Sequence, residues 1–557
     1  MLPTLGMYGI QDQGTFPAPR WTHDHSVALF VNGRLEWALE LERYTRRKHD
    51  NRLHLFLEQL IEEGVLPLPE HFRIIAVDSL AGRAFLSSSG KWRIEGNYIP
   101  LPEGAPLQPA RAFIGFEKVE AFHCFQELAH PASNLPFTGG FEENSLLVHM
   151  DGGASQCNTS AFLYKDGRIT YLYHSWDTVF SVLNFGYNEL TYGMLGMHED
   201  TRMAAPGKLM GYAAYGQDTP ELRAWLHKHD WFRRHLQEPE KFFEAAREDF
   251  GWNATSFDLH DQFLMNIAAC CQAEFEEQML SLLTRLREQT GATRVYAAGG
   301  ATLNVELNRK LLATGLFDEV FIPPCCSDCG LAIGAAALAE FLDRGSVERH
   351  APFLNRAGLS PAKDWGRQLD IKELGDRLER GQVVAICSGA AEVGPRALGH
   401  RSLLASPADM RSRTYVSETI KHREWYRPVA PVVLEELAED LFPGATRTTL
   451  TDFMLCNVIV HPDWRDRIPA VVHVDGTARV QVVRKDAPEQ HLLRALLWEV
   501  WEAHQLPCLA NTSFNGPGEP IVHTVVHARE TARRLGVDVL VIDDRMESYV
   551  PFEMRRW

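Results

Sequence analysis

The chain has 557 residues, of which 45% are hydrophobic and 23% are charged, so we expect a globular protein of two or more domains. Its formal net charge of −17 argues against a broad nucleic-acid-binding surface, because phosphate backbones attract positive charge. We find no apolar stretch that could span a membrane and no signal-peptide pattern, and therefore expect a cytoplasmic protein without membrane contact. The ten cysteines are scattered except in CCSDC at 325–329, which favours buried thiols over structural zinc.

An acid followed by a β-hairpin occurs twice in the chain. Asp24 precedes an apolar strand that turns at Asn32-Gly33 into a second strand. The stretch SLLVHMDGGAS at 145–155 leads through Asp151 into two alternating strands joined by Asp166-Gly167. Glycines after such a strand let backbone N–H groups approach an anion closely. Two copies predict the duplicated, two-lobed fold of actin, Hsp70 and sugar kinases; two unrelated hairpins are the alternative.

Between the hairpins the pattern is less regular. We expect a solvated, charge-dense helix over Leu39–Asp50 and an amphipathic helix over Asn51–Gly64. The turn-rich segment Leu86–Arg111 favours a loop or lid that could shape a substrate pocket.

A helix predicted over His123–Ser133 places His123, Glu127 and His130 on one face. Because the next strand ends in Asp151, a metal site and ordinary helical histidines both remain open.

The middle of the chain carries further glycine-rich stretches. Ala204–Gly216 contains Lys208, whose ammonium could meet a phosphate between glycines. The strand-to-helix turn Gly299–Asn304 is typical either of a nucleotide contact or of an ordinary tight turn. Asp328 lies shortly before a helix of small residues that could pack closely on a neighbour. The flanking predictions are a long helix over Phe263–Gln289, a strand over Val295–Ala298 and a helical stretch within Glu221–Trp252.

A domain boundary is expected in the Pro-punctuated segment Val347–Asp364, followed by a strand at Gln382–Ser388. Beyond it, separate stretches of this acidic chain supply cationic side chains or backbone N–H groups that could bind an anion. Together they would form a pocket for phosphate and carboxylate-like groups. These stretches contain Arg396 and Arg401, then Lys421, Arg423 and Arg427, then Arg479, and finally NTSFNGPGEPIV at 511–522. Arg396 and Arg401 could instead pair with carboxylates within the domain.

At this point the chain resembles the O-carbamoyltransferases that modify antibiotics and nodulation factors. The matching blocks follow in family order over nearly the whole chain: HDHSVALFVNG, ELERYTRRKHD, AHPAS with MDGG, PGKLMGYAAYG, AGGATLN, CSDCGLAIGAA, EVGPRALGHRS, KHREWYRPVAP, DGTARVQ and NTSFNGPGEPIV.

The resemblance implies two α/β domains. Residues 1–350 would be similar to the tRNA threonylcarbamoyl transferase, an actin/Hsp70-like (ASKHA) domain, and residues 365–557 to the YrdC domain, a twisted α/β sheet. It implies that the second domain makes carbamoyl adenylate from carbamoyl phosphate and ATP, with release of pyrophosphate. The first domain would then transfer the carbamoyl group to a hydroxyl of a sugar, nucleoside or polyketide.

The resemblance also implies roles for individual residues. An iron-type divalent metal would be held by His130, Asp151 and Asp328, and Mg²⁺ would accompany ATP. His23 would be the general base or would orient the acceptor hydroxyl, unless it is a structural histidine bonded to the turn at Asp24. Lys421 and Arg479 match catalytic positions for the substrate phosphates. The nucleotide- and substrate-binding positions are Lys208, Gly207, Gly211, Gly300, Asn304, Arg396, Arg423, Arg427, Ser513 and Asn515.

Two positions depart from the family pattern. Gln126 replaces a family histidine, so Glu127, His123 or water could complete the metal site, and Pro517 replaces a basic residue. A tRNA-modifying transferase and an ATP-binding scaffold without turnover are the alternative functions. The oligomeric state and the acceptor stay open.

Overall fold

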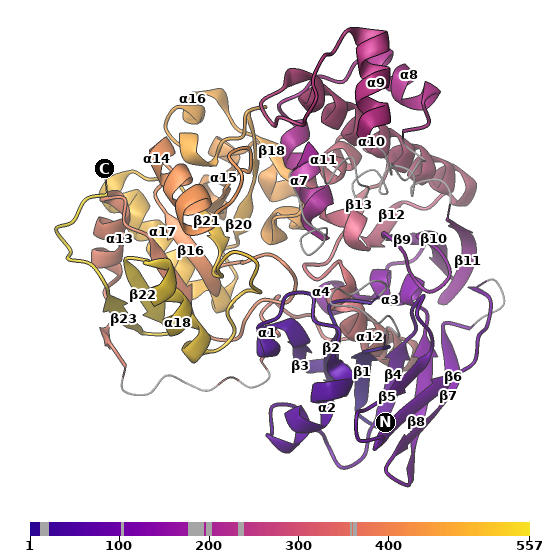
Figure 1. Cartoon of the computed structure of the whole chain (residues 1–557). Coiled ribbons are helices and arrows are strands. Elements are labelled where there is room, and N and C mark those ends of the chain that lie inside the picture. Colours follow the sequence, from indigo (N-terminus) through magenta and orange to yellow (C-terminus); the bar gives the residue numbers. More distant parts are fainter. Residues whose placement is uncertain are drawn as a thin grey trace.

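The computed structural model describes residues 1–11, 22–101, 105–176, 194–195, 203–231, 239–356, 359 and 365–556. Three larger sheets organise these residues (Figure 1). Within the described residues, every helix is too short or too polar to cross a bilayer.

The first sheet has the order β3-β2-β1-β4-β8-β7-β6-β5. Strands β1, β2 and β3 are antiparallel, whereas β4 and β8 run parallel to β1. Asn32-Gly33 forms the turn between β2 and β3, where both residues have positive φ, as the dipeptide predicts. The strands are β1 (Thr4–Tyr8), β2 (Ser26–Val31), β3 (Arg34–Glu40), β4 (Arg73–Val77), β5 (Ala84–Leu86), β6 (Trp92–Gly96), β7 (Leu107–Ile114) and β8 (Glu117–Cys124).

The second sheet repeats this plan. Its order is β11-β10-β9-β12-β13, with β9, β10 and β11 antiparallel and β12 and β13 parallel to β9. The two sheets are therefore the related lobes of an actin/Hsp70-like domain, and the acid-hairpin repeat marks corresponding strands in each lobe. The strands are β9 (Ser145–Met150), β10 (Thr159–Lys165), β11 (Arg168–Ser175), β12 (Arg294–Ala298) and β13 (Glu319–Phe321).

The small-residue helix α12 (Leu331–Arg344) packs against the first sheet and α3. A Cβ on Gly6 of β1 would lie 2.0 Å from the Ala332 carbonyl oxygen, and a Cβ on Gly334 would lie 1.9 Å from that of Ala129. The expected close packing of this helix is therefore present, and it places Asp328 beside both lobes.

The helices of the two lobes flank these sheets. A cluster of aromatic side chains, among them Trp225, Phe242 and Phe263, packs α8 and α9 against α10 at one end of the molecule (Figure 1). The bounds are α1 (Leu41–Thr45), α2 (Leu53–Glu62), α3 (Gln126–Ala132), α4 (Leu135–Thr138), α7 (Ala205–Ala213), α8 (Pro220–Lys228), α9 (Pro239–Phe250), α10 (Gln262–Thr290) and α11 (Val305–Thr314).

The third sheet belongs to the C-terminal part and has the order β14-β23-β22-β15-β16-β21-β17-β20. Apolar clusters cover both faces, one with α13 and α17 and the other with α15 and α18, which gives the YrdC-like α/β domain. Its strands are β14 (Arg367–Gln368), β15 (Val384–Cys387), β16 (Arg401–Ala405), β17 (Ala430–Leu434), β20 (Gln481–Val483), β21 (Leu509–Ser513), β22 (Val539–Ile542) and β23 (Arg545–Ser548). Its helices are α13 (Ile371–Glu379), α14 (Met410–Arg413), α15 (Glu435–Leu441), α16 (Pro462–Arg465), α17 (His491–His504) and α18 (Val525–Leu535), and β18 (Asn457–Ile459) pairs with β19 (Thr477–Arg479) in a small separate sheet.

We propose 1–350 and 365–557 as the limits of the two domains, because the third sheet starts at β14. Residues 357–358 and 360–364 of the predicted boundary lie outside the described residues, as do 232–238 of the stretch Glu221–Trp252.

Several local predictions are wrong. Leu86–Arg111 forms most of β6 and β7, because its turns connect strands of the first sheet. His123 ends β8 and does not share a helix with His130. Ala204–Gly216, for which the glycines alone had indicated no element, contains helix α7 with Pro206 in its first turn. Only Leu41–Thr45 of Leu39–Asp50 is helical, and Arg43 within it is fully buried.

Candidate functional site

His130, Asp151 and Asp328 converge between the two lobes. His130 comes from α3, Asp151 directly follows β9, and Asp328 lies in the turn before α12. The His130 Nε2 atom lies 3.4 Å from Asp328 Oδ1 and 3.9 Å from Asp151 Oδ2. One donor atom from each residue falls within 4.8 Å of the others, a separation that suits ligands of a single ion.

Neighbouring groups orient these side chains. The Gly152 N–H donates to Asp151 Oδ1 at 2.6 Å, and the Gly300 N–H donates to Asp151 Oδ2. The Tyr8 hydroxyl donates to Asp328 Oδ2 at 2.9 Å. The turn at Gly299-Gly300 therefore positions the first acid, and β1 positions the second.

The group fits a divalent cation. The buried Nε2 of His130 has no hydrogen-bond partner. Burial and the nearby Asp328 charge raise the pKa of Asp151, although His130 opposes this. Burial works against protonation of His130, but the nearby carboxylates of Asp328 and Asp151 raise its pKa. A cation would relieve the repulsion between the two acids, and one imidazole with two carboxylates suits several divalent metals.

The alternatives for completing this group occupy different places. Gln126 donates from its amide to Asp328 Oδ1 at 3.4 Å and so lies at the site. Glu127 accepts hydrogen bonds from the Ser155 hydroxyl and the Gln156 N–H, which ties it to the loop after Asp151. The His123 ring lies against Gly96, and burial together with Arg83 lowers its pKa to about 4.

His23 is a second histidine close to Asp328. Its Nε2 lies 3.7 Å from Asp328 Oδ2, and its Nδ1 lies 2.9 Å from Asp24 Oδ2. His49 Nδ1 lies 3.0 Å from the other oxygen of Asp24. Burial opposes protonation, but Asp328 and Asp24 raise the pKa of His23 to about 10. Asp24 and His49 both have left-handed backbone, with φ of 56° and 57°, a conformation that clusters at functional sites.

A cation group in the C-terminal domain has few acids near it. Burial, then Arg396, Arg423 and Arg427, lower the pKa of Arg479 well below its usual value. Burial and neighbouring cations likewise lower the pKa of Lys421 and Arg423, the latter to about 9. The buried Nε atoms of Arg396 and Arg479 have no hydrogen-bond partner. Such a group is destabilising until an anion neutralises it. We use the name cation group for Arg396, Lys421, Arg423, Arg427 and Arg479.

The loop after β21 holds Lys421. Its ammonium donates to the Ser513 carbonyl at 2.7 Å, to the Asn515 carbonyl at 2.8 Å and to Asn515 Oδ1 at 2.5 Å. Ser513 and Asn515 therefore position Lys421 in this structure. The loop also folds back on itself, since the Val522 N–H donates to the Phe514 carbonyl at 2.9 Å.

The two arginines of the EVGPRALGHRS stretch differ. Arg401 is buried and donates to the carbonyls of Ser388, Gly389 and His523 at 2.8–3.1 Å, so it has a structural role. Arg396 instead joins the cation group, and it also lies near Cys326 of the N-terminal domain.

The predicted adenylate-holding residues are only partly brought together. Lys208 on α7 pairs with Glu424 of the C-terminal domain at 2.5 Å, and Gly211 lies near Tyr426. A Cβ on Gly207 would meet no atom within 4 Å. Gly300 lies beside Asp151.

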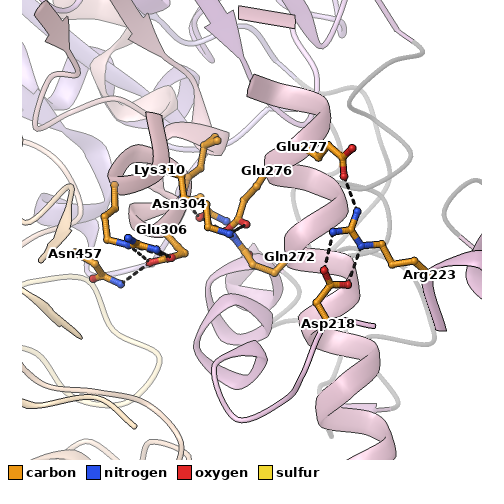
Figure 2. A network of polar contacts seen from close by, with 11 residues as sticks. Asp218, Arg223, Gln272, Glu276, Glu277, Asn304, Glu306, Lys310 and Asn457 are labelled. Carbon is orange, nitrogen blue, oxygen red and sulfur yellow. Dashed lines mark hydrogen bonds and ion pairs between the residues drawn. The ribbon is translucent and has the colours of Figure 1, made fainter. Parts of the chain in front are cut away.

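Asn304 begins α11 as its N-terminal cap and exchanges hydrogen bonds of 3.0 Å with Gln272 on α10 (Figure 2). Its side chain therefore has a structural role here, as in an ordinary tight turn. Two residues on, Glu306 accepts a hydrogen bond from Asn457 of β18 at 3.4 Å, which links α11 to the C-terminal domain (Figure 2).

Our sequence analysis did not single out Lys48. It follows α1 in the N-terminal domain, and its side chain is exposed. The charges of Glu42, Arg427, Asp24 and Arg423 all act on its ammonium group, so Lys48 lies near both Asp24 and the cation group. The charge density of LERYTRRKHD was the only signal in the sequence, and it equally suits a solvated surface.

Comparison with known proteins agrees with this arrangement. Residues 122–337 match the family model described as Carbamoyltransferase N-terminus, and residues 375–548 match Carbamoyltransferase C-terminus. The chain belongs to the carbamoyltransferase family. It is a carbamoyltransferase enzyme.

Relatives in this family include Nodulation protein U of Rhizobium tropici, which is 29% identical over 92% of each chain. Nodulation protein NolNO of Sinorhizobium fredii is also 29% identical, over 93% of this chain and 78% of its own. Among solved structures, full-length HypF in its phosphate- and nucleotide-bound form has a TM-score of 0.30 at 13% identity, covering 62% of this chain and 56% of that chain. A likeness at that score supports no statement about this carbamoyltransferase.

Proposed function

We propose that this carbamoyltransferase forms carbamoyl adenylate at the cation group and transfers the carbamoyl group to a hydroxyl beside His23. The unneutralised cation group carries the proposal. Arginines close enough to repel one another, with the buried Nε–H groups of Arg396 and Arg479 left unpaired, favour a ligand with several negative charges. Carbamoyl phosphate and ATP, the latter with Mg²⁺, are such ligands.

Mass balance fixes the products of the first step. Carbamoyl phosphate, ATP and water give carbamoyl adenylate, pyrophosphate and inorganic phosphate. Water first splits carbamoyl phosphate into carbamate and inorganic phosphate. A carbamate oxygen then becomes bonded to the α-phosphorus of ATP as the bond between the α- and β-phosphates breaks and pyrophosphate leaves. Lys421 and Arg479 would stabilise the negative charge that develops on the phosphates, and Arg423, Arg427 and Arg396 would hold them.

The second step would take place between the lobes. The acceptor oxygen attacks the carbamoyl carbon, AMP leaves, and the hydroxyl proton passes to a base. Because Nδ1 of His23 is bonded to Asp24, its Nε2 faces Asp328 and can reach the hydroxyl. Burial opposes protonation, but Asp328 and Asp24 raise the pKa of His23 to about 10, so His23 must first give up its own proton, which a cation bound at Asp328 would favour.

A divalent cation, such as Fe²⁺, held by His130, Asp151 and Asp328 would neutralise phosphate charge and polarise the leaving group. Gly300 presents its N–H at the same place. Lys208, Gly207, Gly211 and Asn304 remain proposed nucleotide contacts that would require Lys208 and Asn304 to leave their present partners.

We propose a small hydroxyl compound, such as a sugar, nucleoside or polyketide, as the acceptor. The chain's net charge of −17 favours it over tRNA. The cation group favours catalysis over an inert scaffold.

The test uses the purified full chain with ATP, Mg²⁺ and carbamoyl phosphate. We expect pyrophosphate only when carbamoyl phosphate is present, and a steady release of AMP only when a suitable hydroxyl compound is added. Mass spectrometry of candidate acceptors should reveal one added carbamoyl unit. AMP release that does not depend on carbamoyl phosphate would contradict the proposal.

A further inference from the structure

We propose that the segment Glu40–Arg46 of the N-terminal domain positions the cation group of the C-terminal domain. Its two arginines, Arg43 and Arg46, hold two different C-terminal loops through the backbone carbonyls of those loops. One loop carries Arg396, and the other carries the Ser513 and Asn515 oxygens that hold Lys421. This inference rests on the proposed function, because it takes the cation group to be the site where carbamoyl adenylate forms.

Arg43 and Glu40 hold Gly394, two residues before Arg396. The Arg43 guanidinium donates to the Gly394 carbonyl at 2.6 Å, and the Gly394 N–H donates to Glu40 Oε1 at 2.6 Å. Arg43 also donates to Glu40 Oε2 at 3.0 Å, and both side chains are buried. A polar pair that is buried and bonded to both backbone groups of one residue fixes the position of that residue.

Gly394 fits its place closely on the other side. Its φ is +93°, and a Cβ there would lie 2.1 Å from the Pro324 carbonyl oxygen, just before the turn that carries Asp328. The loop is also rigid, because Glu392 accepts the N–H groups of Leu398 and His400 at 2.7 and 2.9 Å. Docking Gly394 therefore sets where the whole loop, with Arg396, lies relative to the N-terminal domain.

Arg46 holds the second loop. Its guanidinium donates to the Ile521 carbonyl at 2.6 Å and to the Pro520 carbonyl at 2.8 Å. On the inner side of the same loop, the Asn515 amide donates to the Glu519 carbonyl at 2.6 Å, and Asn515 accepts from Lys421. Losing the Arg46 contacts should loosen the loop and with it the oxygens that fix Lys421.

The backbone of Arg46 offers a clean variant. Arg46 ends α1 as its C-terminal cap in left-handed conformation, with φ of 60°. Glycine favours this conformation, so Arg46→Gly removes the guanidinium without disturbing the end of the helix. Arg34→Ala is the matched control: it also removes one arginine from the N-terminal domain, but Arg34 is half-exposed, and its ion pairs with Glu36 and Glu348 are 3.8 and 3.9 Å long.

The experiment measures carbamoyl-phosphate-dependent pyrophosphate formation and hydrogen–deuterium exchange in full-length variants. We expect Arg46→Gly to lower kcat/KM for pyrophosphate formation about tenfold, because the variant loses charge-assisted hydrogen bonds. Exchange should rise in 513–522 but not in 389–399. Glu40→Gln should give the reverse pattern of exchange and also lower the rate, and Arg34→Ala should resemble the wild type.

Pyrophosphate formation at the wild-type rate in Arg46→Gly would overturn the inference, as would exchange that is unchanged in 513–522. A wild-type chain that forms no pyrophosphate would contradict the proposed function instead. In that case the exchange patterns would still decide whether Arg46 and Glu40 hold their loops.

Discussion

The group around Asp328 and the cation group of this carbamoyltransferase differ in the charges that they bring together. In the group around Asp328, carboxylates lie next to imidazoles, since Asp328 is near both His23 and His130. Among the residues that the structure describes, the one acid within ion-pair distance of the cation group is Glu424, which lies 3.6 Å from Arg427 but 2.5 Å from Lys208. The first group is arranged to accept a cation, and the second needs an anion. In the proposed function this difference assigns the two half-reactions to separate groups, so each can be tested on its own.

The largest expected effect is loss of transfer in Asp328→Asn. Asp328 contacts Tyr8, His23 and His130, so a neutral amide would weaken any cation bound there and leave His23 without its facing charge. We expect carbamoylated product to fall at least about 100-fold, while pyrophosphate formation stays within about twofold. Product is measured by mass spectrometry. Asp318→Asn, at an exposed acid, is the control, and equal loss of both half-reactions would contradict the separation.

Arg479→Met should weaken adenylate formation and stabilise the fold. Removing a cation that Arg396, Arg423 and Arg427 repel relieves this repulsion, whereas the substrates lose a phosphate contact. We expect pyrophosphate formation to fall about 100-fold and the melting temperature to rise by a few degrees. Calorimetry on this variant and on Arg168→Met, at an exposed arginine, checks the second effect. A lowered melting temperature would mean that Arg479 stabilises the ligand-free fold.

Lys208 and Glu424 form a matched pair for the next test. If Lys208 binds the nucleotide, Lys208→Gln should lower transfer about tenfold, whereas Glu424→Gln, which frees the ammonium, should leave it within about twofold. Transfer rates at saturating carbamoyl phosphate make the comparison. Similar losses in both variants would show that the ion pair between the domains is what matters.

The last prediction concerns the stability of the fold rather than a rate, and it rests on His123, a buried imidazole with no carboxylate partner among the described residues. Its pKa is lowered from 6.5 to about 4, so the unfolded chain binds a proton that the folded chain refuses. The free energy of unfolding should therefore fall as the pH drops from about 6.5 to 4, by no more than about 3 kcal/mol.

His123→Gln should flatten this slope in urea unfolding, and His71→Gln, at an exposed histidine, should not. An unchanged slope in His123→Gln would mean that other groups cause the acid sensitivity.

The local signals in the sequence predicted the hairpins well. Asn32-Gly33 and Asp166-Gly167 determine their turns through backbone conformation alone. The small residues of α12 indicate that this helix packs closely on its neighbours. β1 was missed because Thr4–Tyr8 is short and has a glycine at its centre, which weakens its pattern as a strand. β6 and β7 were mistaken for a loop because prolines and glycines obscured their alternation.

The candidate site was harder to predict, since its contacts join distant parts of the chain. The family resemblance pointed to His130, Asp151 and Asp328, and the fold places them within reach of one ion. The burial of Arg43 could not be read from LERYTRRKHD, because the Gly394 backbone that it binds lies 351 residues away. Helix propensity predicts where a helix forms, whereas tertiary contacts determine which of its faces is buried.

The most direct test follows ¹³C-labelled carbamoyl phosphate in the presence of ATP and Mg²⁺ with no acceptor, in Asp328→Asn and Lys421→Ala. The account predicts that the label becomes attached to the adenylate in Asp328→Asn and does not in Lys421→Ala. Equal amounts of labelled adenylate in the two variants, or label that never joins the nucleotide in the wild type, would contradict it.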